Sequence, residues 1–108
     1  MMRGEVWWVE FDPAVGTEIR KIRPAVIVSN DAANRNLGRV VVVPLTSNTG
    51  RIYRSEAVVT ISGQQNKAMA DQITTADKTR LKTQLGSVSQ KEIKAIEEAI
   101  KIHLALPL

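Results

Sequence analysis

Hydrophobic residues in this chain fall into short runs separated by polar and turn-forming residues, and only the C-terminal segment shows helical spacing. Short runs rich in β-branched and aromatic residues are typical of β-strands. They predict strands over residues 5–11, 24–28, 39–45, 56–61, 67–74 and 81–88, the fifth with weak alternation. Between them we expect a loop at 14–20, a helical turn or loop at 31–36, an exposed loop at 46–54, a turn at 62–63 and a helical turn at 75–79.

The second of these strands begins at a proline. Four apolar residues follow Pro24 before Ser29 and Asn30, which predicts a strand buried on both faces. Because proline has no N–H group to donate, we expect Pro24 at the first position of the strand. The residue before a proline favours extended geometry, so Arg23 is expected at the strand edge, where its guanidinium can face a cleft.

The C-terminal segment predicts an amphipathic helix. Ser89 and Glu92 form a capping-box pattern at its start. The apolar residues Ile93, Ile96, Ile100 and Leu104 then share one face, and Pro107 is expected to end the helix. Many short strands followed by one such helix predict a mainly β protein, a small antiparallel β-barrel with a packed terminal helix, in one domain over residues 1–108.

Composition narrows the chemistry that the chain can carry. It has no cysteine and a single histidine, which excludes disulfides and argues against a metal site, so we expect no cofactor. No apolar run approaches the length of a membrane span and no export signal opens the chain, so we expect a cytoplasmic protein that contacts no membrane. The net charge of +4 permits a polyanionic partner without establishing one.

Two residues at predicted strand boundaries are candidates for phosphate chemistry. Arg23 enters the second strand and Thr46 leaves the third, and such boundaries can meet at one rim of a small barrel. A fixed arginine can bind a phosphate in bidentate fashion, and a threonine hydroxyl can donate to its oxygen. Strand-end residues of these types also form salt bridges and cap turns, and the residues alone leave that alternative open.

Other polar and aromatic residues suit RNA. The carboxylates Asp71 and Glu18 are candidate bases, because RNA cleavage can use the substrate's own 2′-hydroxyl as nucleophile. Asp71, if buried, would need a partner such as Arg23, whereas Glu18 is equally consistent with a solvated charge. Trp7 and Trp8 should point to opposite faces, one in the core and the other exposed or at an interface. Arg51, Tyr53 and Arg54 combine cations with a ring, which suits single-stranded RNA but also a solvated loop.

Taken together, six motifs in order along nearly the whole chain resemble the MazF/PemK (Kid) family of toxin endoribonucleases. They are Arg3-Gly4-Glu5-Val6-Trp7, Asp12-Pro13 with Gly16-Thr17-Glu18, the Arg23–Asn30 stretch, Asn34-Arg35, Val43-Pro44-Leu45-Thr46-Ser47, and Asp71-Gln72-Ile73 with Thr75 and Asp77. The chain departs from the pattern at Thr17, where the Kid-like branch has a histidine, and at Thr74, where the family has an arginine.

The resemblance implies an SH3-like barrel that forms a homodimer, with an interface expected around the end of the 39–45 strand and the terminal helix. It implies metal-independent cleavage of single-stranded RNA (mRNA) at a short sequence, leaving 2′,3′-cyclic phosphate and 5′-hydroxyl ends. As a toxin the protein would inhibit translation and growth, and the disordered tail of a cognate antitoxin would occupy the RNA groove.

The family's catalytic residues fall on Arg23 and Thr46, and the base proposed in its Kid-like branch falls on Asp71. We expect the RNA groove to involve the 14–21 and 46–54 loops, with RNA-binding residues Thr17, Glu18, Lys21, Ser47, Asn48, Arg51, Tyr53, Arg54 and Gln72. Two alternatives remain: a toxin of the same fold that acts on DNA gyrase, and an RNA-binding module without catalysis.

Overall fold

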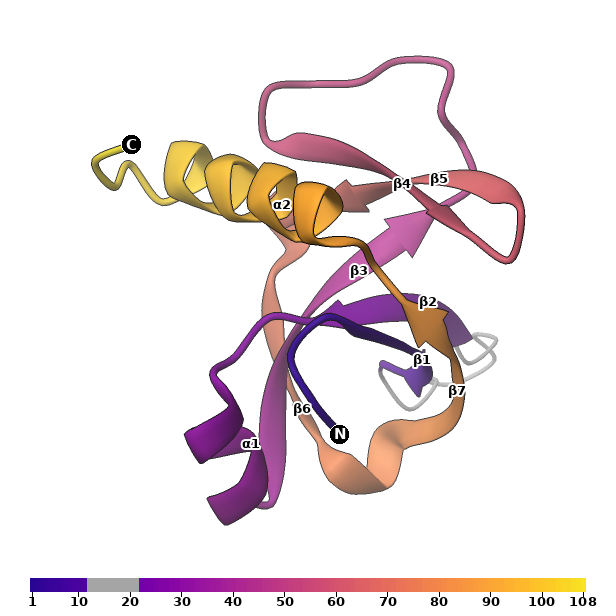
Figure 1. Ribbon diagram of the computed structural model, residues 1–108, viewed down its shortest axis with the longest axis vertical. Helices are drawn as coiled ribbons and strands as arrows, with labels where there is room; N and C mark the ends of the chain where they lie inside the picture. The colour runs from indigo at the N-terminus through magenta and orange to yellow at the C-terminus, as the bar shows by residue number, and fades with distance from the viewer. Residues whose placement is uncertain (12–21) are drawn as a thin grey trace, which may run out of the picture.

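The computed structural model describes residues 1–11 and 22–108, which form a curled antiparallel sheet with one long helix (Figure 1). The elements, in order, are β1 (Glu5–Glu10), β2 (Ile22–Ile27), α1 (Asp31–Asn36), β3 (Arg39–Thr46), β4 (Glu56–Ile61), β5 (Gln64–Met69), the 3₁₀ turn η1 (Ala70–Gln72), β6 (Thr74–Asp77), the 3₁₀ turn η2 (Lys78–Arg80), β7 (Leu81–Ser87) and α2 (Gln90–His103).

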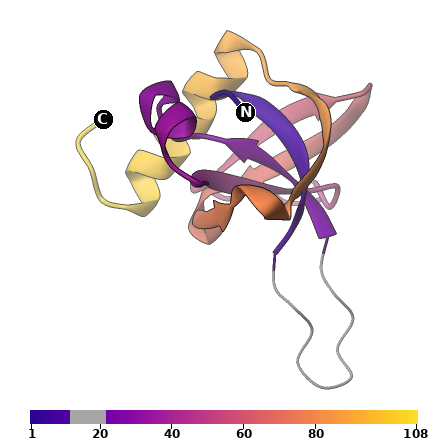
Figure 2. The same ribbon diagram turned by 90° about the horizontal axis from the view of Figure 1, so that it is seen from below.

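Strand β3 is the centre of the sheet. Its first half pairs with β6, its middle with β2 and its last two residues with β5, so the strand order is β4-β5-β3-β2-β1-β7 with β6 attached to β3. All of these pairs are antiparallel. The sheet curls into a half-barrel, and α2 lies against β4 and η1 (Figure 2). The predicted fold, a small antiparallel barrel with a packed terminal helix, is confirmed in this form.

The interior is built from the apolar runs that the sequence singles out. Ala25 to Ile27 of β2 and Val42, Val43 and Leu45 of β3 have at most 1% of their surface exposed. The terminal helix buries Ile93, Ile96 and Ala99 against this core, and Ile100 is half-buried. The prediction that Leu104 continues this buried face is wrong, because Leu104 is the C-cap residue of the helix and is 49% exposed.

Both ends of α2 have identifiable caps. The predicted capping box is present, because the Ser89 hydroxyl accepts from the Glu92 N–H (3.1 Å) and the Glu92 carboxylate accepts from the Ser89 N–H (2.8 Å). The helix stops at His103, before Pro107 is reached. Ala105 has a left-handed backbone (φ 57°) and the Leu106 N–H bonds the Lys101 carbonyl (2.8 Å), the pattern of a Schellman motif.

Three local predictions need correction. Pro24 is the third residue of β2 rather than its first, since β1 pairs with β2 as far out as Ile22. The fifth strand is Gln64–Met69, because the turn at Ser62-Gly63 returns the chain directly along β4. Residues 74–77, where the end of that strand and the start of a helical turn were expected, form β6, and only 78–80 form a helical turn. In both cases the pairing partner, β4 or β3, outweighs weak local alternation.

The described part of the chain has no helix with the length and apolar character needed to cross a membrane.

Candidate active site

The two predicted strand-boundary residues line one cavity. Arg23 of β2 and Thr46 of β3 are both half-buried and border a cavity of about 510 Å³. Buried Leu45 and Ile61 contribute apolar surface to it, and Trp8, 37% exposed, borders it from β1. The prediction that these two strand ends meet at one rim is confirmed.

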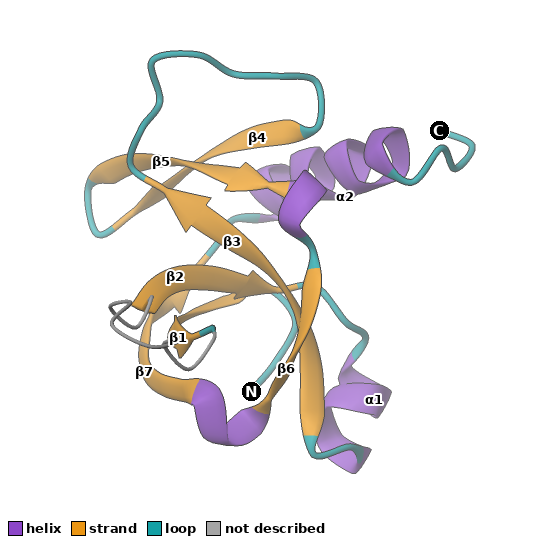
Figure 3. Cartoon of the chain, turned by 180° about the vertical axis from the view of Figure 1, so that it is seen from behind, coloured by secondary structure: helices purple, strands orange, loops and turns teal. Residues whose placement is uncertain are grey.

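The first cavity lies where β3 passes from its pairing with β2 to its pairing with β5, which lie on opposite edges of β3 (Figure 3). Pairing of β2 with β3 ends at Ala25 and Pro44, and on the opposite edge of β3 the strand β5 pairs with Leu45 and Thr46. The same register carried on by two residues would set Arg23 level with Thr46 across the gap.

Thr46 is positioned by its own turn. Its hydroxyl oxygen accepts a hydrogen bond from the Asn48 N–H (3.3 Å). A hydroxyl has one donor and two acceptor positions, so this bond leaves the hydroxyl proton to be donated to a ligand in the cavity. The turn-capping role and the ligand-binding role are therefore compatible. Ser47 also lines the cavity.

A second cavity of about 400 Å³ lies on the other side of Arg23. It is lined by Phe11, Arg23, Pro44, Gln72, Thr74, Thr75, Ala76 and Arg80. Arg23 thus borders both cavities. Gln72 is one of the predicted RNA-binding residues, whereas no motif in the sequence analysis includes Arg80. Thr74, which stands where the family motif has an arginine, shares this cavity with Arg80.

Asp71 differs from the expectation of a buried carboxylate paired with Arg23. It lies in η1, is exposed, and has no hydrogen bond or ion pair with any described residue. It borders neither cavity, although its neighbour Gln72 borders the second. Its role as a base stays a prediction.

The loop after β3 is exposed, as predicted, and is held by a residue that the sequence analysis did not single out. The Arg51 guanidinium lies 5.0 Å from the centre of the Tyr53 ring. The Lys67 ammonium lies 5.5 Å from the same ring, donates to the Arg51 carbonyl (2.8 Å) and pairs with Glu56 (3.1 Å). Lys67 lies in the polar strand Gln64–Met69, so no pattern in the sequence marks it as this anchor. Arg54 is exposed in the same loop.

Of the remaining predicted site residues, only Asn48 lies in the part of the chain that the structure describes. Thr17, Glu18 and Lys21 lie outside the described residues. Asn48 is exposed and follows Ser47 in the chain, but it does not line the first cavity. Among the described side chains, no group of three histidines or carboxylates comes together in a way that could hold a metal ion.

Trp7 and Trp8 divide as predicted. Trp7 packs against the core and donates from its indole nitrogen to Glu5 (2.9 Å), while Trp8 faces the first cavity. Trp8 is therefore available to a ligand or a partner.

Fold and site together define a small basic half-barrel protein whose adjoining cavities share an arginine. The chain belongs to the PemK-like, MazF-like toxin family of type II toxin–antitoxin systems, whose model matches residues 2–104. It is 44% identical to the endoribonuclease MazF9 of Mycobacterium tuberculosis over 115 aligned positions, covering 98% of both chains. It is 35% identical to the endoribonuclease MazF of Staphylococcus saprophyticus, covering 98% of this chain and 92% of the relative.

Solved structures agree with this assignment. An endoribonuclease from a mycobacterial species superimposes with a TM-score of 0.84 at 29% identity, covering 100% of this chain and 94% of the other. A mycobacterial endoribonuclease in complex with its cognate antitoxin superimposes with a TM-score of 0.82 at 31% identity, covering 100% and 98%.

Proposed function

We propose that this protein is the toxin of a toxin–antitoxin pair and an endoribonuclease that cleaves single-stranded mRNA at a short sequence, inhibiting translation and growth. The observation that carries the proposal is the placement of Arg23 and Thr46 on one cavity in a chain of the MazF-like family. Arg23 is a charge stabiliser, because a guanidinium stays protonated in proteins and is a poor base.

The proposed reaction needs no group beyond the protein and the RNA. The 2′-oxygen of the substrate attacks the neighbouring phosphorus, the bond to the 5′-oxygen breaks, and the products carry a 2′,3′-cyclic phosphate and a 5′-hydroxyl. One proton leaves the 2′-hydroxyl for a base and one is delivered to the departing 5′-oxygen. Arg23 and the Thr46 hydroxyl hold the non-bridging oxygens as negative charge develops on them. Asp71 is the proposed base; because it borders neither cavity, it would have to come within hydrogen-bond reach of the attacking 2′-hydroxyl when the RNA binds.

The loop after β3 would bind the RNA outside the reacting group. Tyr53 is 54% exposed with the Arg51 guanidinium over its ring, an arrangement on which a base can stack. Arg54 adds a further cation, Ser47 offers a hydroxyl at the cavity, and Asn48 is an exposed amide next to it in the chain. On this proposal the loop governs affinity and sequence preference.

A homodimer and an antitoxin are the proposed partners. Leu104, Leu106 and Leu108 are each at least 49% exposed at the C-terminal end of α2, which supports the predicted interface at the terminal helix. The predicted contribution from the end of β3 has less support, because Val43 and Leu45 are buried within the chain. The mycobacterial structural neighbour bound to its cognate antitoxin supports the second partner.

The test is cleavage of a long RNA in EDTA, with fragments mapped by primer extension. Wild-type protein is expected to cut at a common short sequence and Arg23→Ala to give no cuts, while Arg35→Ala, an exposed arginine of α1, cuts like wild type. Thr46→Ala should slow cleavage strongly while RNA binding stays within about tenfold (~1.4 kcal/mol). Thr60→Ala, an exposed threonine of β4, is its matched control. Folded, antitoxin-free protein that cuts no RNA would favour the gyrase-directed or binding-only alternatives.

A further inference from the structure

We infer that the second cavity is a binding site for the RNA phosphate next to the one that is cleaved, with Arg80 as its principal cation. This inference rests on the proposed function and adds a binding site to it. The cavity in question is the one of about 400 Å³ between Arg23 and Arg80.

The donors that line this cavity suit a phosphodiester. Two arginines, two threonines (Thr74 and Thr75) and Gln72 border it, and none of its described lining residues is acidic. A phosphodiester carries one negative charge and offers non-bridging oxygens that only accept hydrogen bonds, and arginine is well matched to that geometry. A neutral or cationic ligand would leave the two guanidinium groups without a counter-charge.

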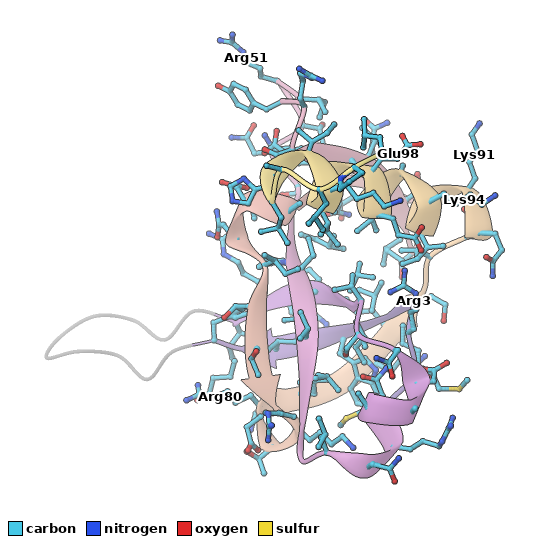
Figure 4. The ribbon with its side chains drawn as sticks, turned by 90° about the vertical axis from the view of Figure 1, so that its left-hand side faces the viewer. Arg3, Arg51, Arg80, Lys91, Lys94 and Glu98 are labelled. Carbon is cyan, nitrogen blue, oxygen red and sulfur yellow. The ribbon has the colours of Figure 1, made fainter. Side chains whose placement is uncertain are left out.

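Arg80 is held in place by backbone groups at the end of β1. One of its terminal nitrogens donates to the carbonyl of Phe11 and to that of Glu10 (3.2 Å). A guanidinium has five N–H donors, so this anchor leaves others for a ligand. In Figure 4, Arg80 and Arg51 lie at opposite ends of the molecule, so Arg80 does not belong to the loop after β3.

The carboxylate three residues before Arg80, that of Asp77, already accepts hydrogen bonds. Asp77 accepts hydrogen bonds from the Thr79 N–H (2.9 Å) and from the Thr79 hydroxyl (2.7 Å). These bonds, backbone first, lower the pKa of Asp77, and the charge of Arg80 adds a smaller effect. No ion pair joins Asp77 to Arg80 among the described contacts, so the guanidinium keeps its charge for another anion.

Arg23 relates the two cavities. In the proposed reaction the scissile phosphate lies between Arg23 and Thr46 in the first cavity, and the second cavity begins on the other side of Arg23. An RNA strand that continues past Arg23 therefore places a neighbouring phosphate between Arg23 and Arg80. Two consecutive phosphates would be held by three groups on β2, β3 and η2.

The experiment removes one charge from the RNA at a time. Once the cleaved sequence is mapped, short RNAs are made with a methylphosphonate, which lacks the charge, at each linkage on either side of the scissile one. For wild-type protein we expect one neighbouring linkage to raise KM about tenfold with kcat little changed (~1.4 kcal/mol). For Arg80→Gln we expect a similar rise in KM on unmodified RNA and less than about a twofold further rise at that linkage.

Two further measurements separate this effect from a structural one. Loss of a phosphate contact to a single strand should lower the slope of log KM against log salt by about 0.7, a change that destabilisation does not produce. Arg35→Gln, an exposed arginine elsewhere, should leave both KM and slope unchanged. If Arg80→Gln does not fold, Thr75→Val, which removes a lining hydroxyl but keeps a branched strand residue, should show the same loss of sensitivity at the same linkage, to a smaller degree.

The results that overturn the inference are distinct from failure of the proposed function. The proposed phosphate-binding site would be overturned if a methylphosphonate raised KM equally in wild type and Arg80→Gln, or raised it at no neighbouring linkage, while unmodified RNA was still cleaved. Absence of cleavage by wild type would overturn the proposed function and this inference with it.

Discussion

The ion pair between Lys67 and Glu56 provides a quantitative test of how the loop after β3 is held. Both side chains are nearly buried (10% and 8% exposed), the least exposed ion pair of the described residues. Lys67→Met keeps the length of the side chain but leaves the Glu56 carboxylate with the Tyr53 N–H (2.7 Å) as its remaining donor. Breaking a buried pair from one side costs about 3–5 kcal/mol. Because one donor remains, we expect the lower end, about 3 kcal/mol, or a Tm lower by about 12 °C.

Urea unfolding followed by the fluorescence of Trp7 and Trp8 measures this loss, with all variants at one protein concentration. Lys94→Met, at an exposed position of α2, is the matched control and should stay within about 0.5 kcal/mol of wild type. Glu56→Gln combined with Lys67→Met should be more stable than Lys67→Met alone, because no charge is then left buried. The reasoning would be refuted if Lys67→Met lowered the free energy of unfolding by less than about 1 kcal/mol. It would also be refuted if the loss in the double variant equalled the sum of the losses in Lys67→Met and Glu56→Gln alone.

Two further predictions concern the ends of α2. Ala105→Gly should raise the free energy of unfolding by about 1 kcal/mol, because Ala105 has a positive φ of 57° that glycine adopts without steric cost; an unchanged urea midpoint would contradict this. Burial is the largest single influence on Glu92 and raises its pKa, but the N–H groups of Ser89 and Thr60 together outweigh it and lower the pKa. A lowered folded pKa adds stability above the unfolded value of about 4.5 and loses it as the pH falls through the folded value. Wild type should therefore lose more stability than Glu92→Gln between pH 7 and pH 3, and equal losses in parallel urea titrations would refute the assignment.

The strands that could be predicted from the sequence are those whose side chains are apolar enough to require burial. The runs of β1, β2, β3 and β4 are apolar enough to require burial, and the observed strands agree with the predicted ones within two residues. The stretch from Gln64 to Asp77 is polar and weakly alternating. Its division into β5, η1 and β6 depends on pairing first with β4 and then with β3, which no local pattern encodes.

The candidate site divides in the same way. Arg23 and Thr46 could be placed because each adjoins a strand whose limits are visible in the sequence. Arg80 could not, because it reaches the second cavity from a 3₁₀ turn far along the chain and is held by carbonyls of β1 and of the residue after it. Backbone acceptors have no sequence signature. Lys67 could not be singled out in the polar stretch Gln64–Met69, and its partners Arg51 and Glu56 become neighbours only through the β4–β5 hairpin.

The location of the site on strands rather than loops bears on how the protein would work. Arg23 and Thr46 lie in β2 and β3, so their relative position is set by sheet pairing before any RNA is bound. Groups that are preorganised in this way stabilise developing charge without reorganisation during the reaction. Arg51, Tyr53 and Arg54 lie in the loop instead, and its conformation depends on the Lys67–Glu56 pair. Changes in that pair should therefore appear in KM, whereas changes at Arg23 or Thr46 should appear in kcat, because in the proposed reaction only the strand residues hold the phosphate that reacts.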